Sequence, residues 1–285
     1  MTQLLQAVIS GLALGALFAV IGIGFVVIHR VTHVVNLAQG GIAVLGAYVM
    51  SSVVSSVPWG VAVLVSAVAA ALAAAVIGLL VVSAKTTFEH APIIMTLGIA
   101  IASQGFFVLI WGDIPRTYEP ISSEAYKVFG AFVLPQQLLL VGAVAVVLLL
   151  LQLFFSNTYL GKALTAAALN QRSAQLVGVN LLRAGTIAFA IAGLVAGLGG
   201  AIFGALVPVT PESHLPIAVA GFAAAVFGNF YSPAATVVGG VGLGQLTSFT
   251  ATFGDPAYQD VVSLSALVLV LLVRTVWERR GGVLS

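Results

Sequence analysis

The sequence predicts an all-α, polytopic integral membrane protein with eight or nine transmembrane helices, some of them short or broken. Of its 285 residues, 61% are hydrophobic and only 6% are charged, whereas a soluble domain carries about 25% charged residues. The mean hydropathy is +1.18. Apolar runs of roughly 20 residues, the length that crosses a bilayer as a helix, recur along the chain. Lipid offers the backbone no hydrogen-bond partners, so such runs fold as helices.

The apolar runs define nine expected spans in one domain covering residues 1–285. The first run is longer than the core of a signal peptide, and no small-residue cleavage pattern follows it, so we expect it to be a retained span. The seventh and eighth runs are short, and Gly228, Asn229 and Pro233 interrupt them, which favours a broken or re-entrant pair. The runs lie near residues 4–28, 37–57, 60–83, 91–111, 134–155, 185–207, 217–230, 234–252 and 259–275.

The basic residues gather on one side of this topology. Only Arg116 and Lys127 fall on the other side, in a loop that also carries acids. Because cytoplasmic loops are enriched in Lys and Arg, we expect the N-terminus to lie outside and the C-terminus in the cytoplasm. The residues on the expected cytoplasmic side are Arg30, Lys85, Lys162, Arg172, Arg183, Arg274, Arg279 and Arg280.

Two connecting loops are long. The external loop, about 112–133, is polar and aromatic, and is either a plain connector or a docking surface for an external partner. The cytoplasmic loop, about 156–184, is rich in helix formers and ends in the turn signals Gly178 and Asn180. It predicts a short amphipathic helix, a turn and then the next span. Such a helix lies on the membrane surface or inserts into a groove of a cytoplasmic motor protein.

Polar residues at membrane depth are the candidates for a translocation pathway, because they are costly there and usually face protein or water. Thr96 and Ser103 share a helix face, so they line the pathway or bond their own backbone carbonyls. His29, His33, Asn36 and Gly40 would share one face of a continuous helix entering the second span, although a polar turn is the alternative. The candidates are Asn36, Gln39, Gly40, Thr96, Ser103, Gln104 and Asn229, followed by Gln245, Thr247 and Ser248.

Several function classes are not expected. The scattered positive charges give no support to nucleic-acid binding, and the absence of cysteine excludes disulfides and thiolate metal sites. Dispersed histidines suggest neither a catalytic triad nor a metal site. The segment "GKA" at 161–163 lacks the features of a Walker A motif. The acid nearest to a span centre, Asp260, lies at the outer start of the last span, so the sequence argues against an ion-coupled carrier.

Glycines spaced four residues apart occur within several spans. They are Gly11/Gly15, Gly193/Gly197, Gly200/Gly204 and Gly240/Gly244. Small residues at this spacing allow helix backbones to approach closely. These glycine faces pack against other helices of the same chain, or one of them packs against a partner subunit.

The ordered motifs resemble the permease subunits of branched-chain amino-acid ABC importers. The cytoplasmic loop resembles theirs in "GKA" at 161–163 and "AQLVGVN" at 174–180. The segments "VVNLAQGGIAVLGAYV" (34–49), "MTLGIAIASQG" (95–105) and "VFGNFYSPAATVVGGVGLGQL" (226–246) resemble family segments in the same order. The chain departs from the family by lacking the acid of the general loop motif, by Thr165 where relatives often carry Arg, and by Gly41 where many carry an acid.

The resemblance implies a non-catalytic permease subunit of an ATP-driven importer in the bacterial inner membrane. It implies a second homologous permease, or a second copy of itself, as well as two cytoplasmic ATPase subunits and an extracytoplasmic binding protein. The ATPases, and not this chain, would bind ATP and Mg²⁺. Residues 36–40 would line the inner half of the pathway, with His29 and Arg30 at an interface. The residues expected to contact the ATPase are Lys162, Ala166, Ala167, Ala168, Arg172, Gly178 and Val179.

The implied solute is a branched-chain amino acid or a related small polar molecule. A stand-alone secondary transporter or channel for a small neutral solute is the alternative, and a purely structural membrane subunit is a third, weaker one.

Overall fold

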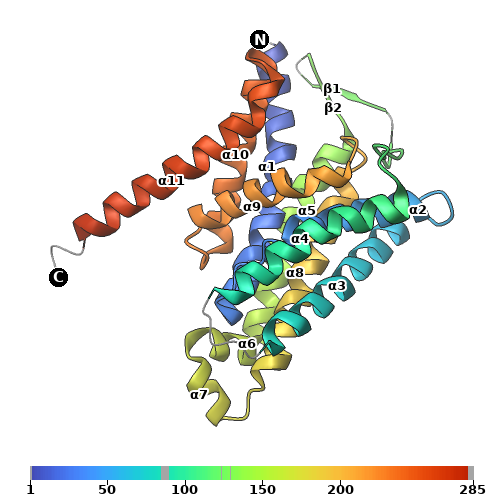
Figure 1. Cartoon of the computed structure of the whole chain (residues 1–285). Helices are drawn as coiled ribbons and strands as arrows, with labels where there is room; N and C mark the ends of the chain where they lie inside the picture. The colour runs from blue at the N-terminus through green and yellow to red at the C-terminus, as the bar shows by residue number, and fades with distance from the viewer. Residues whose placement is uncertain (1, 85–89, 123, 129, 282–285) are drawn as a thin grey trace.

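The computed structural model describes residues 2–84, 90–122, 124–128 and 130–281. Helices make up most of these ranges (Figure 1), and a short antiparallel hairpin pairs Tyr126 with Val133. Two 3-10 turns, η1 (Pro211–Ser213) and η2 (Pro256–Tyr258), precede α9 and α11. The other elements are α1 (Thr2–Thr32), α2 (Gln39–Val53), α3 (Trp59–Ser83), α4 (Ala91–Trp111), β1 (Tyr126–Val128), β2 (Ala131–Val133), α5 (Pro135–Asn157), α6 (Tyr159–Leu169), α7 (Gln171–Leu176), α8 (Leu181–Phe203), α9 (His214–Phe227), α10 (Pro233–Phe253) and α11 (Gln259–Gly281).

Every expected span coincides with a helix, and the all-α membrane architecture is confirmed. Five helices, α1, α3, α4, α5 and α8, are long and apolar enough to cross a membrane. Helix α4 has the expected bounds, whereas α8 begins at residue 181 rather than 185. The seventh and eighth runs form two helices, with the turn between them at the interruption that the sequence marks. The hairpin in the 112–133 loop was not expected.

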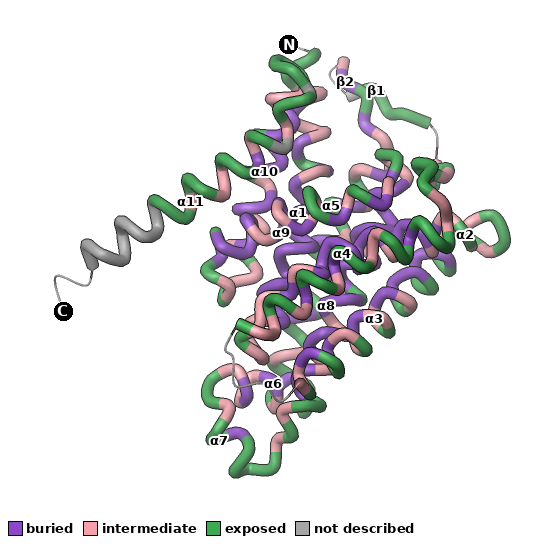
Figure 2. The backbone as a smooth tube through the Cα atoms, in the orientation of Figure 1, coloured by how far each residue is buried: buried purple, intermediate pink, exposed green. Residues whose placement is uncertain are grey.

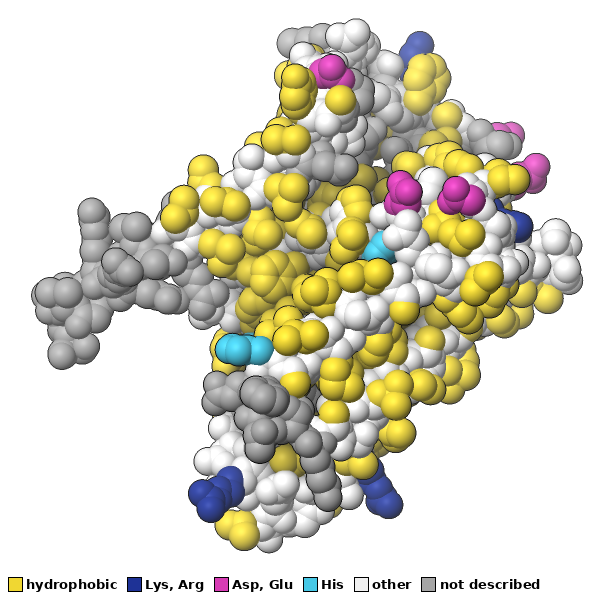
Figure 3. All heavy atoms as spheres, viewed as in Figure 1, with side chains coloured by type: hydrophobic (Ala, Val, Ile, Leu, Met, Phe, Trp, Pro, Cys, Tyr) yellow, Lys and Arg dark blue, Asp and Glu magenta, His cyan; other side chains and the backbone are white. Residues whose placement is uncertain are grey.

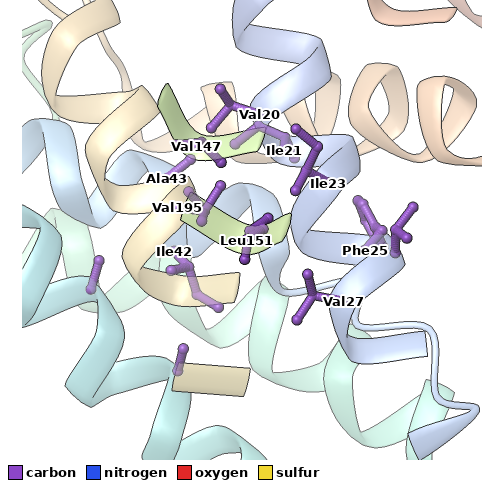
Figure 4. Close-up of a cluster of buried hydrophobic side chains, with 14 of the residues drawn as sticks. Val20, Ile21, Ile23, Phe25, Val27, Ile42, Ala43, Val147, Leu151 and Val195 are labelled. Carbon is purple, nitrogen blue, oxygen red and sulfur yellow. The ribbon is translucent and has the colours of Figure 1, made fainter. Parts of the chain in front are cut away.

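Helix α1 is the central helix of the bundle. It is apolar on all sides and most of its length is buried (Figure 2), as expected for a helix surrounded by protein. Its side chains Val20, Ile21 and Ile23 lie close to Val147 of α5 and Val195 of α8 (Figure 4). The other helices therefore pack around α1.

Glycines allow α1 and α10 to pack with their backbones almost in contact. A Cβ atom added at Gly15 would lie 2.6 Å from the Cα of Val241, and one added at Gly240 would lie 2.6 Å from the backbone nitrogen of Ala19. Ser248 donates a hydrogen bond of 2.7 Å to the carbonyl of Ala7 across the same contact. All four glycine pairs with four-residue spacing pack against segments of this chain, so their packing is intramolecular.

The outward faces of α3, α4 and α5 are apolar and exposed, as Figures 2 and 3 show for α3 and α4. Leu64 and Leu72 on α3 and Leu109 on α4 are among the exposed side chains. A protein in water rarely exposes so large an apolar surface. These faces suit the lipid tails of a bilayer.

The two ends of the bundle differ in charge. The N-terminus and the β-hairpin lie at one end, here called the hairpin end, and α6 and α7 lie at the other (Figure 1). In the view of Figure 3 the acidic side chains gather toward the hairpin end. Lys162, Arg172 and Arg183 belong to the α6–α8 segment. Lys85 lies outside the described residues, as do the side chains of Arg274, Arg279 and Arg280.

Candidate translocation and coupling site

The segment between α1 and α2, residues 33–38, folds back into the bundle. We call it the re-entrant link. A Cβ atom added at Gly24 of α1 would lie 2.9 Å from Cδ of Gln39, and Gly24 precedes the end of α1 by eight residues. At 1.5 Å per residue, α2 therefore begins about 12 Å inside the end of α1. The chain thus places a helix start within the depth of the bundle.

The expected continuous helix through residues 29–40 is wrong. His33 has φ +59°, in the left-handed region that ends a helix. The hydroxyl of Thr32 accepts a hydrogen bond from the Val34 amide at 3.2 Å, and the Asn36 carboxamide accepts one from the Ala38 amide at 3.2 Å. These side chains satisfy backbone donors that a continuous helix would have paired.

Asn36 and Gln39 form a buried polar pair at the start of α2. Both are 0% exposed. Asn36 Nδ2 donates to Gln39 Oε1 at 3.2 Å, and Gln39 Nε2 donates to the Ala192 carbonyl of α8 at 3.0 Å. The pair holds the start of α2 against α8. In this structure neither side chain faces an open pathway, and their contact with solute stays a prediction.

Thr96 attaches α4 to the re-entrant link. Its Oγ1 accepts from the Leu37 amide at 3.2 Å and lies 3.2 Å from the Val35 carbonyl. Ser103, one of the two residues with alternative roles, donates to the carbonyl of Ala100 at 2.6 Å. Its Oγ also faces α2, because a Cβ atom added at Gly41 would lie 2.7 Å from it. The link is therefore fixed by side chains from α4 as well as its own.

Gly40, Gln104 and Asn229 lie in three different places. Gly40 packs against the His214 carbonyl and Ala218 of α9, whereas Gln104 is half-buried on α4. Asn229 is exposed in the α9–α10 turn, with φ +55°. The next residue, Phe230, places its ring centroid 4.8 Å from that of His29 on α1. Asn229 therefore belongs to a different region from the start of α2.

The 156–184 loop folds as two short helices rather than one. Helix α6 ends at Leu169, because the next residue, Asn170, has an extended backbone (φ −158°). The Asn170 side chain accepts a hydrogen bond from the Ser173 amide at 3.0 Å and so caps α7. Gly178, with φ +90°, forms the expected turn before α8. Asparagine and glycine favour these conformations, so the sequence contains the signal for both breaks.

The residues expected to contact the ATPase differ in exposure. Three of them, Lys162, Arg172 and Gly178, are exposed. Ala167 is buried and faces the bundle. Ala166, Ala168 and Val179 are half-buried.

Three aliphatic side chains of this unit are highly exposed, although Leu169 and Leu176 belong to the apolar positions of the predicted amphipathic helix. Leu169 is 84% exposed, Leu176 86% and Val177 78%. They lie around the ends of α6 and α7, where a helical pattern alone does not indicate which face is free. Together they form an exposed apolar tip on the α6–α7 unit, which projects from the end of the bundle (Figure 1).

Gln171, the first residue of α7, connects this unit to the re-entrant link. Its Nε2 donates to the carbonyl of Val31 at 3.1 Å and lies 3.1 Å from Nδ1 of His33. In the sequence, Gln171 is only one of several polar residues in the 156–184 loop. Nothing local in the sequence pairs residues that are 138 or more positions apart, so this contact could not be predicted.

At the hairpin end, the 112–133 loop is bound to the segment that follows α8. The backbones of Arg116 and Val209 exchange two hydrogen bonds, of 3.0 and 2.9 Å. The hydroxyl of Tyr118 donates to the Ala201 carbonyl at 2.6 Å, and burial raises the pKa of this phenol, which stays protonated. The loop thus closes this end of the bundle around the end of α8.

Comparison with known proteins identifies the family. The family model described as "Branched-chain amino acid transport system / permease component" matches residues 7–271. No solved structure gave a significant match.

Curated relatives match along most of the chain. The high-affinity branched-chain amino acid transport system permease protein LivH of Salmonella typhimurium is 25% identical, over 94% of this chain and 93% of its own. BraD of Pseudomonas aeruginosa, with the same description, is 27% identical over 95% and 94%. The probable branched-chain amino acid transport permease protein LivH of Methanocaldococcus jannaschii is 24% identical over 90% and 86%.

Proposed function

The chain belongs to the branched-chain amino acid transport permease family, and we propose that it is the membrane subunit of an ATP-driven importer. It would form a single permease domain across a bacterial inner membrane, with the N-terminus outside and the α6–α7 end in the cytoplasm. All nine apolar helices, including the short α2 and α9, would lie at membrane depth. The family membership and the charge difference between the two ends support this placement.

The α6–α7 unit is the proposed contact for the ATPase. Its exposed tip, Leu169, Leu176 and Val177, lies beyond the helices expected in lipid, where an apolar side chain gains nothing from exposure to water. A cytoplasmic groove that accepts a short helix would cover it. This apolar tip is the observation that carries the proposal.

We propose that movement reaches the pathway through the re-entrant link. Gln171 connects α7 to the link, and Gln39 at the far end of the link bonds α8. A displacement of the α6–α7 unit by the ATPase would therefore shift the start of α2 relative to α8. Alternating access requires such a change of packing at the centre of the bundle.

The proposal assigns ATP hydrolysis to other chains. Two ATPase subunits would bind ATP and Mg²⁺, and a binding protein outside would deliver the solute. A second homologous permease, or a second copy of this chain, would complete the pathway. This subunit would be non-catalytic and would hold no cofactor.

ATP-driven uptake in proteoliposomes tests the proposal. The chain would be reconstituted with its ATPase, partner permease and binding protein, and uptake of leucine, isoleucine and valine would be measured with and without ATP. Uptake that depends on ATP and on the ATPase is the expected result. Uptake at the same rate without the ATPase would favour the secondary transporter or channel.

Replacement of Gly178 tests the coupling loop within the same assay. Gly178→Leu places a side chain at φ +90°, a strained conformation for any residue with a Cβ atom. ATP-dependent uptake should be abolished while membrane insertion is retained. Gly98→Leu is the matched control, because Gly98 is exposed on α4 and a Cβ atom there meets no other atom of the described residues.

A further inference from the structure

Five buried side-chain polar atoms lack hydrogen-bond partners among the described residues, and three of them are His29 Nδ1, Trp59 Nε1 and Gln245 Oε1. The other two, Tyr48 Oη on α2 and His214 Nε2 at the start of α9, lie on two elements that pack against each other. Each residue is 1% exposed. Leaving a buried donor or acceptor unpaired costs free energy, and native structures rarely do so. The two atoms therefore need a physical explanation.

The unpaired nitrogen of His214 is a hydrogen-bond acceptor in the neutral ring. Nδ1 lies 2.8 Å from the Pro211 carbonyl, and a carbonyl can only accept, so Nδ1 carries the proton. The neutral imidazole then offers the lone pair of Nε2. Thr210 and Ser213 bond to each other's backbone or side chain around η1 and hold Pro211 in place. The orientation of the ring is thus set by its own turn.

Both residues belong to one contact between α2 and residues 209–218, which we call the α2 seam. Gly40, Val44 and Tyr48 are four residues apart and lie on one face of α2. A Cβ atom added at Gly40 would lie 2.8 Å from the backbone nitrogen of Ala218, and the His214 carbonyl is closer still. Further along, Val44 and Tyr48 pack with Val209 in one buried cluster. The seam thus extends from the start of α2 inside the bundle toward the hairpin end.

The α2 seam is closed in this structure. At the hairpin end the two hydrogen bonds between Arg116 and Val209 hold residue 209 against the loop. Trp111 stacks on Tyr48 with ring centroids 5.2 Å apart, and Phe107 lies 5.4 Å from the same ring. The side chains buried with Tyr48 are apolar or aromatic, and Ile217, three residues after His214, packs against them.

We propose that Tyr48 and His214 contact the transported solute along the α2 seam when its hairpin end opens. The inference rests on the proposed transport function and assigns contact residues for the solute which that function implies, a small zwitterion with an aliphatic side chain. The His214 lone pair would accept from its ammonium group and the Tyr48 hydroxyl would donate to its carboxylate. Val44, Phe107 and Ile217 would contact the apolar side chain. The two polar atoms are unpaired here because their partner is the solute.

Cysteine accessibility tests the proposal directly, because the chain has no cysteine of its own. Tyr48→Cys and His214→Cys would be introduced singly into the reconstituted transporter with its partners. Modification of this subunit by a membrane-impermeant methanethiosulfonate, added at the outer side, would be followed by mass during ATP turnover. We expect modification during turnover, and several-fold slower modification when leucine and the binding protein are supplied in excess. Ser66→Cys on α3 is the matched control, since Ser66 is 0% exposed and should remain unmodified.

Transport kinetics supply a second measurement. Loss of one hydrogen bond to a charged group should raise KM about tenfold in Tyr48→Phe and His214→Leu, with insertion unchanged. His214→Gln, which retains an acceptor, should restore part of the affinity. The inference would be overturned if KM were unchanged in both Tyr48→Phe and His214→Leu. It would also be overturned if neither cysteine were modified while wild-type uptake proceeds. Each unpaired atom would then be explained by a structural water.

The outcomes separate this inference from the proposed function. Labelling and KM effects in a transporter that needs no ATP would overturn the importer but leave the α2 seam as its pathway. ATP-driven uptake with neither labelling nor a change in KM would support the importer but overturn the α2 seam as its pathway.

Discussion

Gln171 and His33 join the α6–α7 unit to the link between α1 and α2. Nε2 of Gln171 lies 3.1 Å from Nδ1 of His33, and the same nitrogen donates to the Val31 carbonyl. His33 has a left-handed backbone that turns the chain back into the bundle. One side chain of the proposed ATPase contact thus touches the residue where the re-entrant link begins.

Gln171→Ala should uncouple ATP hydrolysis from uptake. Removing the carboxamide frees α7 from the link without changing the exposed tip, so ATPase activity should remain while uptake falls by up to about tenfold, the effect of one or two net hydrogen bonds. Both rates would be measured in the same proteoliposomes. Gln175→Ala, an exposed residue of the same helix, is the control. Equal losses in the two variants would contradict a specific role for Gln171.

Leu176→Ala should weaken binding of the ATPase. A leucine that becomes buried on association contributes about 1.5–3 kcal/mol, so the apparent affinity should fall about tenfold or more. Binding of the purified ATPase to the permease in nanodiscs would measure it. Leu153→Ala, which is also exposed but lies on α5, should leave the affinity unchanged. A normal affinity for Leu176→Ala would exclude this tip as the contact.

Asn36→Leu should lower transport and preserve assembly with the ATPase. The substitution removes the donor to Gln39 and the acceptor for the Ala38 amide, and an unsatisfied buried partner costs about 1–3 kcal/mol. The start of α2 would then lose its fixed position against α8. Uptake and co-purification of the ATPase are the two measurements. Transport at the wild-type rate would indicate that the re-entrant link is only a polar turn with no role in the pathway.

Gly244→Leu should destabilise the bundle. A Cβ atom at this position meets the backbone of Gly15 on α1, and overpacking of this kind costs about 1–3 kcal/mol. The fraction of monodisperse protein after heating in detergent would show the loss. At Gly142 of α5 a Cβ atom meets no other atom of the described residues, so Gly142→Leu should behave as the wild type. Equal heat resistance in both variants would be inconsistent with the α1–α10 packing.

The positions of the helices could be predicted from the sequence because each depends on a local property. Apolar runs must form helices in lipid, and Asn170, Gly178 and Pro233 favour helix ends where the structure has them. The depth of the re-entrant link could not be predicted in the same way. The sequence indicates Gln39 and Thr96 as candidates, but their partners, the Ala192 carbonyl and the Leu37 amide, lie 153 and 59 positions away along the chain.

The sequence by itself determined the membrane architecture, the order of the apolar helices and the family. Only the tertiary structure decided which faces meet: Gln171 with His33, Gln39 with the carbonyl of Ala192, and Tyr48 and His214 along one seam. The physical reason lies in α1, the central helix, which is apolar on all sides. Its hydropathy drives it into the membrane but gives no preference for one face. Glycine contacts and a few buried hydrogen bonds between distant segments supply that preference instead.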